Sequence, residues 1–166
     1  VSAVLFCFLP CYYAFANTEG LRAPLIAVLD SGIDDKYGAL AGHLIPGRDF
    51  TGKGSALVDQ VGHGTAMAGL VLFGAEGLQG CGGCRLMPVR VTNGPQVNLT
   101  LLARAVRWAS DEGADVILTA MGAPVSTPEL AEAIEYAANA GVSVVAPIAS
   151  SGSVQPLFPG SFRSVV

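Results

Sequence analysis

The sequence predicts an α/β fold with a doubly wound parallel sheet, and three features of the chain point to it. Strand-like and helix-like segments alternate along the 166 residues, the pattern of right-handed βαβ units. Residues 25–30 form a continuous apolar run, as expected of a strand buried on both faces of a parallel sheet. The 21 glycines and 10 prolines indicate the many tight turns that such a fold needs.

The first half of the chain is expected to contain two strands and one helix. After the strand at 25–30, the glycine-rich residues 34–61 are predicted to be loop. An apolar helix is predicted at 66–73 and a second strand at 86–91. Pro88 lies inside that strand, which predicts a bulge or an edge there because proline cannot donate to a sheet ladder.

The second half continues the alternation. The expected elements are a helix at 98–112, a strand at 115–119, a helix at 127–140, a strand at 142–147 and the start of another strand at 164–166. The helix at 127–140 has the clearest boundaries. Thr127 is a typical N-cap, Pro128 stands at the first helical position, and Gly141 ends the helix.

Composition excludes several classes of protein. With 51% apolar and 13% charged residues, the chain can form a core and does not resemble a disordered segment. The net charge of −4 and the absence of any run of Lys and Arg argue against a nucleic-acid partner. Composition therefore leaves a globular domain whose partner is not a nucleic acid.

The first 16 residues are predicted to be the remnant of a secretory signal peptide. They carry no charge and end in the small-x-small sequence Ala14-Phe15-Ala16. A short membrane anchor is the alternative, although the segment is short of the about 20 residues that span a bilayer. On this interpretation, residues 17–22 are a linker, the protein is secreted or otherwise extracytoplasmic, and no stable membrane span is expected.

Four cysteines are present, and two of them belong to the predicted signal segment. The others, Cys81 and Cys84, are predicted to form a small disulfide loop, as is common in exported proteins. Free thiols, or half of a zinc site, are the alternatives. A full zinc site would need both of the chain's histidines as further ligands, and no metal is expected.

Two short motifs carry the chemistry. Asp30-Ser31-Gly32 closes the first strand, and Gly62-His63-Gly64 opens the first helix. Because sites in open α/β sheets form at the carboxyl ends of the strands, this Asp and His can meet there, where the segments 119–122 and 148–152 also lie. Asp30 and His63 would then be two members of a nucleophilic triad. The alternative for His63 is a structural histidine at a helix start.

The ordered set of motifs resembles the subtilisin-like serine proteases, the subtilase family. The residues that carry the resemblance are 28–34, 63–65, 88–91, 108–109 and 113–117. The resemblance implies that residues 23–166 are part of a subtilase catalytic domain. It implies that His63 is the general base and that Asp30 orients its imidazole. The family's nucleophile segment, Gly-Thr-Ser-Met-Ala, is not found, so the resemblance implies a chain truncated before the nucleophile helix.

Further positions follow from the resemblance. Ala120-Met121-Gly122 stands where the family pairs with the substrate backbone, although Met121 is equally well explained as core. Pro147-Ile148-Ala149 stands in the main specificity pocket, which these side chains would narrow. Ser150 replaces the family's oxyanion-hole Asn, and Ala66 replaces a second His. Ala39 replaces a calcium ligand, so no cofactor is expected.

Two functions are compatible with these observations. The first is a secreted serine endopeptidase acting on peptides or proteins, with Asp30 and His63 present here and no appreciable activity in the 166 residues alone. The second is an inactive subtilase-like binding module, which the residues at 66, 120 and 150 favour. A nucleotide-binding Rossmann domain is disfavoured because no Gly-x-Gly-x-x-Gly follows the first strand.

Overall fold

A computed structural model describes residues 22–36, 38–52, 54–149 and 155–166. The elements within these residues are β1 Leu25–Asp30, β2 Arg48–Asp49, α2 His63–Phe73, β3 Gly74–Ala75, β4 Leu78–Gln79, β5 Arg85–Arg90, α3 Leu99–Asp111, β6 Val116–Thr119, α4 Pro128–Asn139 and β7 Ser143–Val145. The predicted signal segment lies outside the described residues. No described helix has the length and apolar character needed to cross a bilayer.

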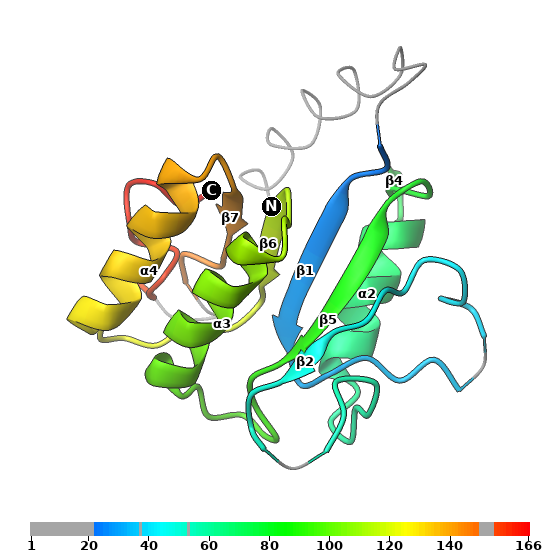
Figure 1. Ribbon diagram of the computed structural model, residues 1–166, viewed down its shortest axis with the longest axis horizontal. Helices are drawn as coiled ribbons and strands as arrows, with labels where there is room; N and C mark the ends of the chain where they lie inside the picture. The colour runs from blue at the N-terminus through cyan, green and yellow to red at the C-terminus, as the bar shows by residue number, and fades with distance from the viewer. Residues whose placement is uncertain (1–21, 37, 53, 150–154) are drawn as a thin grey trace.

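The main sheet has five parallel strands in the order β2-β5-β1-β6-β7 (Figure 1). Helix α2 covers one face, and α3 and α4 cover the other, so the predicted doubly wound α/β fold is confirmed. β1 lies at the centre, with Asp30 opposite Arg90 of β5 and Leu29 opposite Thr119 of β6. The ends of three strands therefore meet at one edge of the sheet.

Burial follows the alternation of side chains along the strands. Ala27 and Leu29 of β1 face α3 and α4, where the larger core cluster forms. Val28 faces α2 and packs with Ala68 and Leu72. Because both faces are covered, β1 reads as an unbroken apolar run in the sequence.

α4 agrees closely with its prediction. Thr127 is its N-cap, with Oγ1 accepting the N–H of Leu130 at 3.2 Å, and Pro128 occupies the first turn. Gly141 follows the helix at φ 78°, a left-handed conformation that suits glycine. In the segment 164–166, where the start of a strand was predicted, Val165 forms an isolated parallel bridge with Val144 of β7.

Three expectations need correction. α2 begins at His63, as the Gly62-His63-Gly64 motif indicated, and so extends the predicted apolar segment 66–73 by three residues; its first turn is capped from a preceding loop residue described below. β7 ends at Val145, because the chain then leaves the sheet and Pro147 packs against Gly160. The loop 34–61 contains the short strand β2, which pairs with β5 only at 89–90.

Pro88 lies near the edge of the sheet, as predicted. β5 is not an outermost strand, but on its outer side it pairs with Leu44 through Leu86, and with β2 through Val89 and Arg90. Pro88 lies between these contacts, where a ladder N–H is not needed.

At the opposite end of β5, Cys81 and Cys84 form a disulfide, with their Cα atoms 5.5 Å apart. Cys84 is buried, and the N–H of Cys81 donates to the carbonyl of Val71 in α2. The predicted disulfide is therefore present. It closes a small loop within the β4–β5 connection, far along β5 from Asp30, and the Cys81 N–H bond joins this connection to α2.

Candidate active site

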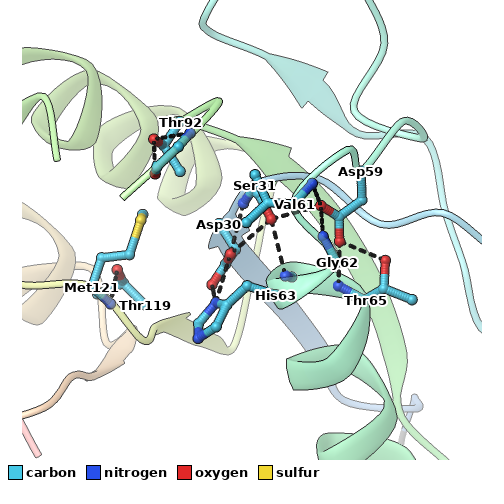
Figure 2. Close-up of polar contacts among 12 residues, drawn as sticks. Asp30, Ser31, Asp59, Val61, Gly62, His63, Thr65, Thr92, Thr119 and Met121 are labelled. Carbon is cyan, nitrogen blue, oxygen red and sulfur yellow. Dashed lines mark hydrogen bonds and ion pairs between the residues drawn. The ribbon is translucent and has the colours of Figure 1, made fainter. Parts of the chain in front are cut away.

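Asp30 and His63 are in direct contact (Figure 2). His63 Nδ1 lies 2.9 Å from each of the two carboxylate oxygens of Asp30. The Asp30 side chain is only 2% exposed, whereas the His63 side chain is 49% exposed. An ionised carboxylate can only accept a hydrogen bond, so Nδ1 carries the proton and donates a hydrogen bond to Asp30. The other ring nitrogen, Nε2, is left as the acceptor on the side away from Asp30.

Backbone packing brings these two side chains together. A Cβ on Gly64 would lie 2.1 Å from the carbonyl oxygen of Gly32 and 3.0 Å from the Cβ of Asp30. Only glycine allows α2 to approach the end of β1 so closely. Gly32 has φ 106°, which turns the chain sharply after the strand. The glycines on both sides of the Asp–His pair are thus steric requirements of the contact.

Asp59 was not singled out in the sequence, yet it organises the start of α2. Its Oδ1 accepts the N–H groups of Val61 and Gly62, and its Oδ2 accepts the N–H and Oγ1–H of Thr65. It also accepts the hydroxyl of Ser31 at 2.7 Å. The only available signal was an acidic residue just before a helix start, where N–H groups lack partners.

The hydrogen bonds at Asp59 outweigh its partial burial. Burial by itself raises the pKa of this carboxyl group, while the side-chain and backbone donors of Thr65, the Ser31 hydroxyl and the Gly62 N–H lower it. The net result is a pKa below the ordinary value of 3.8. Asp59 is therefore an anion at neutral pH, held at the positive end of the α2 dipole.

The segment Ala120-Met121-Gly122 follows β6 and lies at the same edge of the sheet as Asp30 (Figure 2). Met121 is partly buried and packs against the larger core cluster, so its contacts agree with the core alternative. Its N–H donates to Thr119 Oγ1 at 3.4 Å. All three residues are half-buried, which leaves part of this strand-like segment at the surface.

The segment after β7 is more open. Pro147 is partly buried, Ala149 is exposed, and Ile148 is 68% exposed. The carbonyl of Ile148 accepts the N–H of Leu157 at 2.9 Å, which anchors the backbone. Ser150, the candidate oxyanion-hole residue, lies outside the described residues.

A hollow of about 620 Å³ lies beside the loop that follows β5. Sequence reasoning did not identify it. Thr92 fixes the loop, with Oγ1 close to the carbonyls of Gly94 and Gln96 at 2.7 and 2.9 Å. The hollow is lined by Thr51, Val91, Thr92, Asn93, Gln96, Val97, Asn98 and Leu101.

The expected loss of a calcium site concerns Ala39, which is exposed in the loop before β2. In the described parts of the chain, no three His, Cys, Asp or Glu side chains gather closely enough to hold a metal ion.

Comparisons with known proteins agree with this architecture. A sequence model described as the subtilase family matches residues 22–161. The chain is 34% identical over 160 residues to a thermophilic serine proteinase of Bacillus sp. (strain AK1), covering 93% of this chain and 40% of that protein. It is 31% identical over 158 residues to thermitase of Thermoactinomyces vulgaris, covering 92% of this chain and 56% of that protein. The chain thus spans about half the length of these relatives.

Solved structures show the same fold. The S41 psychrophilic protease superposes with a TM-score of 0.75 at 24% identity, covering 92% of this chain and 57% of that one. Fervidolysin from Fervidobacterium pennivorans superposes with a TM-score of 0.73 at 24% identity, covering 87% of this chain and 24% of that one. The match to the subtilase family model over residues 22–161 shows that the chain belongs to the subtilase family.

Proposed function

We propose that this chain is the Asp- and His-bearing part of a secreted serine endopeptidase. One observation carries the proposal: the buried Asp30 carboxylate holds Nδ1 of a half-exposed His63. This contact selects the tautomer whose Nε2 lone pair is free to accept a proton. A hydroxyl nucleophile is weak at neutral pH and needs such a base.

The proposed reaction is acyl transfer. His63 takes the proton of a serine hydroxyl as the oxygen attacks the peptide carbonyl carbon, and then gives that proton to the leaving amine. Water repeats the sequence to release the acyl group. Asp30 stabilises the imidazolium formed in each step, and its charge is the reason that a buried carboxylate is useful here. No cofactor takes part in this scheme.

The nucleophile is proposed to come from outside the 166 residues. Among the described residues, Ser31 contacts the pair, but its hydroxyl lies against the carboxylates of Asp59 and Asp30, on the Nδ1 side of His63. It is therefore not placed to give its proton to Nε2. We expect the 166-residue chain alone to show no appreciable peptidase activity.

The substrate is proposed to be a peptide or protein segment. Ala120-Met121-Gly122 would pair with its backbone, as an added strand at the edge of the sheet. Pro147, Ile148 and Ala149 would line the pocket for one substrate side chain, and Ser150 would offer a hydroxyl to the developing oxyanion. The Cys81–Cys84 disulfide supports an oxidising, extracytoplasmic location.

An inactive binding module is the second candidate. The large exposed side chain of Ile148, at 68%, favours it, because an apolar residue at the surface can contact a partner. In that case the Asp30–His63 contact would remain but would serve no turnover.

The experiment expresses the gene through to its own stop codon and compares that protein with the 166-residue chain. The longer protein should hydrolyse a broad peptide substrate and react with a serine-directed phosphonate, and His63→Ala should abolish both. The 166-residue chain should do neither. A folded longer protein without turnover or labelling would contradict the endopeptidase and support the binding module.

A further inference from the structure

Ser31 links Asp30 to a second carboxylate, that of Asp59 (Figure 2). Ser31 Oγ lies 2.7 Å from Asp59 Oδ1 and 3.1 Å from Asp30 Oδ1. The same oxygen accepts the backbone N–H of Gly64 at 3.1 Å. A serine hydroxyl has one proton and serves one of the two carboxylates at a time. The shorter distance indicates that the hydroxyl donates its hydrogen bond to Asp59.

The Asp59 carboxylate is held in place to accept this hydrogen bond. Its Oδ1 also accepts from Val61 and Gly62 at 3.1 and 2.8 Å, and its Oδ2 accepts from the N–H and Oγ1–H of Thr65 at 2.9 and 2.7 Å. These donors belong to the first turn of α2 and the residues just before it. The same helix start carries His63, so Asp59 and the imidazole are fixed to one rigid element.

We propose that Asp59 is a positioning residue for the Asp30–His63 pair, because its carboxylate accepts the hydrogen bond of the Ser31 hydroxyl, which Asp30 would otherwise accept. The inference rests on the proposed function for its catalytic meaning. Asp30 then accepts from the Ser31 N–H, at 2.7 Å, and from His63, but not from the hydroxyl. A carboxylate that receives fewer hydrogen bonds keeps more charge toward the imidazole.

Without Asp59 as an acceptor, the Ser31 hydroxyl would turn to Asp30 Oδ1, which is already within 3.1 Å. Asp30 would then hold a protonated His63 less strongly. Two other charged residues belong to segments next to the pair. Arg90 is the register partner of Asp30 on β5, and the backbone N–H of Asp34 donates to Thr65 Oγ1. Neither is altered by the variants below, so their effect on His63 stays constant.

The experiment titrates His63 by NMR in the 166-residue chain. Asp59→Asn is expected to move the titration midpoint of His63 to lower pH by about half a unit, or about threefold in the protonation equilibrium. Ser31→Ala is expected to leave the midpoint within about 0.2 units, because the hydroxyl that it removes is bonded to Asp59. In the Ser31→Ala background, Asp59→Asn should have less than about half its effect, since only direct attraction between charges remains.

Thr65→Val is the control for helix capping. It removes a donor to Asp59 but leaves the Asp59 carboxylate free to accept from Ser31. It should lower the stability of the chain without moving the His63 midpoint to lower pH. A purely structural role for Asp59 would instead make the Thr65 and Asp59 variants behave alike.

Two results would overturn the proposal. One is an equal effect of Asp59→Asn with and without the Ser31 hydroxyl. The other is a higher midpoint in Ser31→Ala, which would show that the hydroxyl serves Asp30. If Asp59→Asn does not fold, Ser31→Ala decides the question alone. None of these measurements needs a nucleophile, so they stay interpretable if the longer protein proves to have no peptidase activity.

Discussion

The start of α2 and the segment after β7 lie at the same edge of the sheet, but they are built differently. At the start of α2, Asp30 and Ser31 are almost fully buried, and every carboxylate oxygen of Asp30 and Asp59 has a partner. After β7, Ile148 is 68% exposed and is anchored through its backbone. The proposed proton-transfer groups are thus preorganised within the chain, whereas the proposed substrate-binding surface is open.

Asp30→Asn in the longer protein should have the largest effect on the site at the start of α2. An amide in place of the carboxylate can donate to Nδ1 and hold the imidazole in the wrong tautomer, and in such triads kcat falls about 10⁴-fold. Turnover of a chromogenic peptide is the measurement. Asp34→Asn is the matched control, because the Asp34 carboxylate bonds the backbone N–H of Lys36 and not His63. Similar losses in both variants would contradict a special role for Asp30.

Gly64→Ala should disturb the start of α2 by steric conflict. Its Cβ would lie 2.1 Å from the Gly32 carbonyl oxygen, a backbone atom, so α2 must move away from β1. We expect a loss of about 3 kcal/mol in the free energy of unfolding, measured with urea. Gly69→Ala, in the same helix, has nothing within 4 Å of the added atom. It should gain up to about 1 kcal/mol from helix propensity, and equal effects at the two glycines would refute the steric argument.

Much of the fold could be predicted from local sequence signals. The unbroken apolar run of β1 and the cap, proline and glycine around α4 each depend on residues close together in the chain. The contact between Asp30 and His63 was expected because parallel strands bring their carboxyl ends to one edge. Local patterning and one topological rule were sufficient for these features.

Asp59 shows where sequence reasoning stopped. It lies in a glycine-rich loop without periodicity, and its bond to Ser31 joins residues 28 positions apart. Its position just before a helix start is a local signal for capping, but no local pattern indicates its bond to Ser31. The apolar pattern of α2 begins at Ala66, three residues after the helix itself, because the first turn is capped by a side chain that precedes the helix.

Removing the Cys81–Cys84 disulfide tests whether the first region depends on distant parts of the fold. By chain entropy, closing a loop this short contributes about 2 kcal/mol, so the double variant Cys81→Ala, Cys84→Ala should lose about that much. The NMR titration of His63 should not change, because the disulfide lies at the amino end of β5. Reduction of the unaltered chain is the matched control. A shifted titration would show that the site is coupled to this connection.

Ile148→Ala should sharpen the contrast from the side of the open region. The side chain is mostly exposed, so the free energy of unfolding should change by less than about 0.5 kcal/mol. In the longer protein, a wider pocket should raise kcat/KM for a peptide with a large apolar side chain by about tenfold over one with alanine. Val125→Ala, also exposed at 62%, is the control. An unchanged ratio would remove Ile148 from the proposed pocket.

The smallest effect should appear in acid and should belong to Asp59. Its pKa lies below 3.8, because the donors of Thr65, Ser31 and Gly62 outweigh burial. A carboxyl group whose pKa is lower in the folded than in the unfolded state adds stability above the unfolded value and loses it as pH falls through the folded value. The unaltered chain should therefore lose more stability than Asp59→Asn between about pH 5 and pH 2.5.

Solvent screens a partly exposed group, so we expect this difference to be on the order of 0.5 kcal/mol, measured by urea unfolding at each pH. Thr65→Val should show part of the same loss of acid dependence, because it removes one of the donors that keep Asp59 ionised. Identical acid dependence in all three proteins would mean that the hydrogen bonds at Asp59 do not favour its charged form. The Ser31 hydroxyl would then donate its hydrogen bond to Asp30, and the start of α2 would be less preorganised than its geometry indicates.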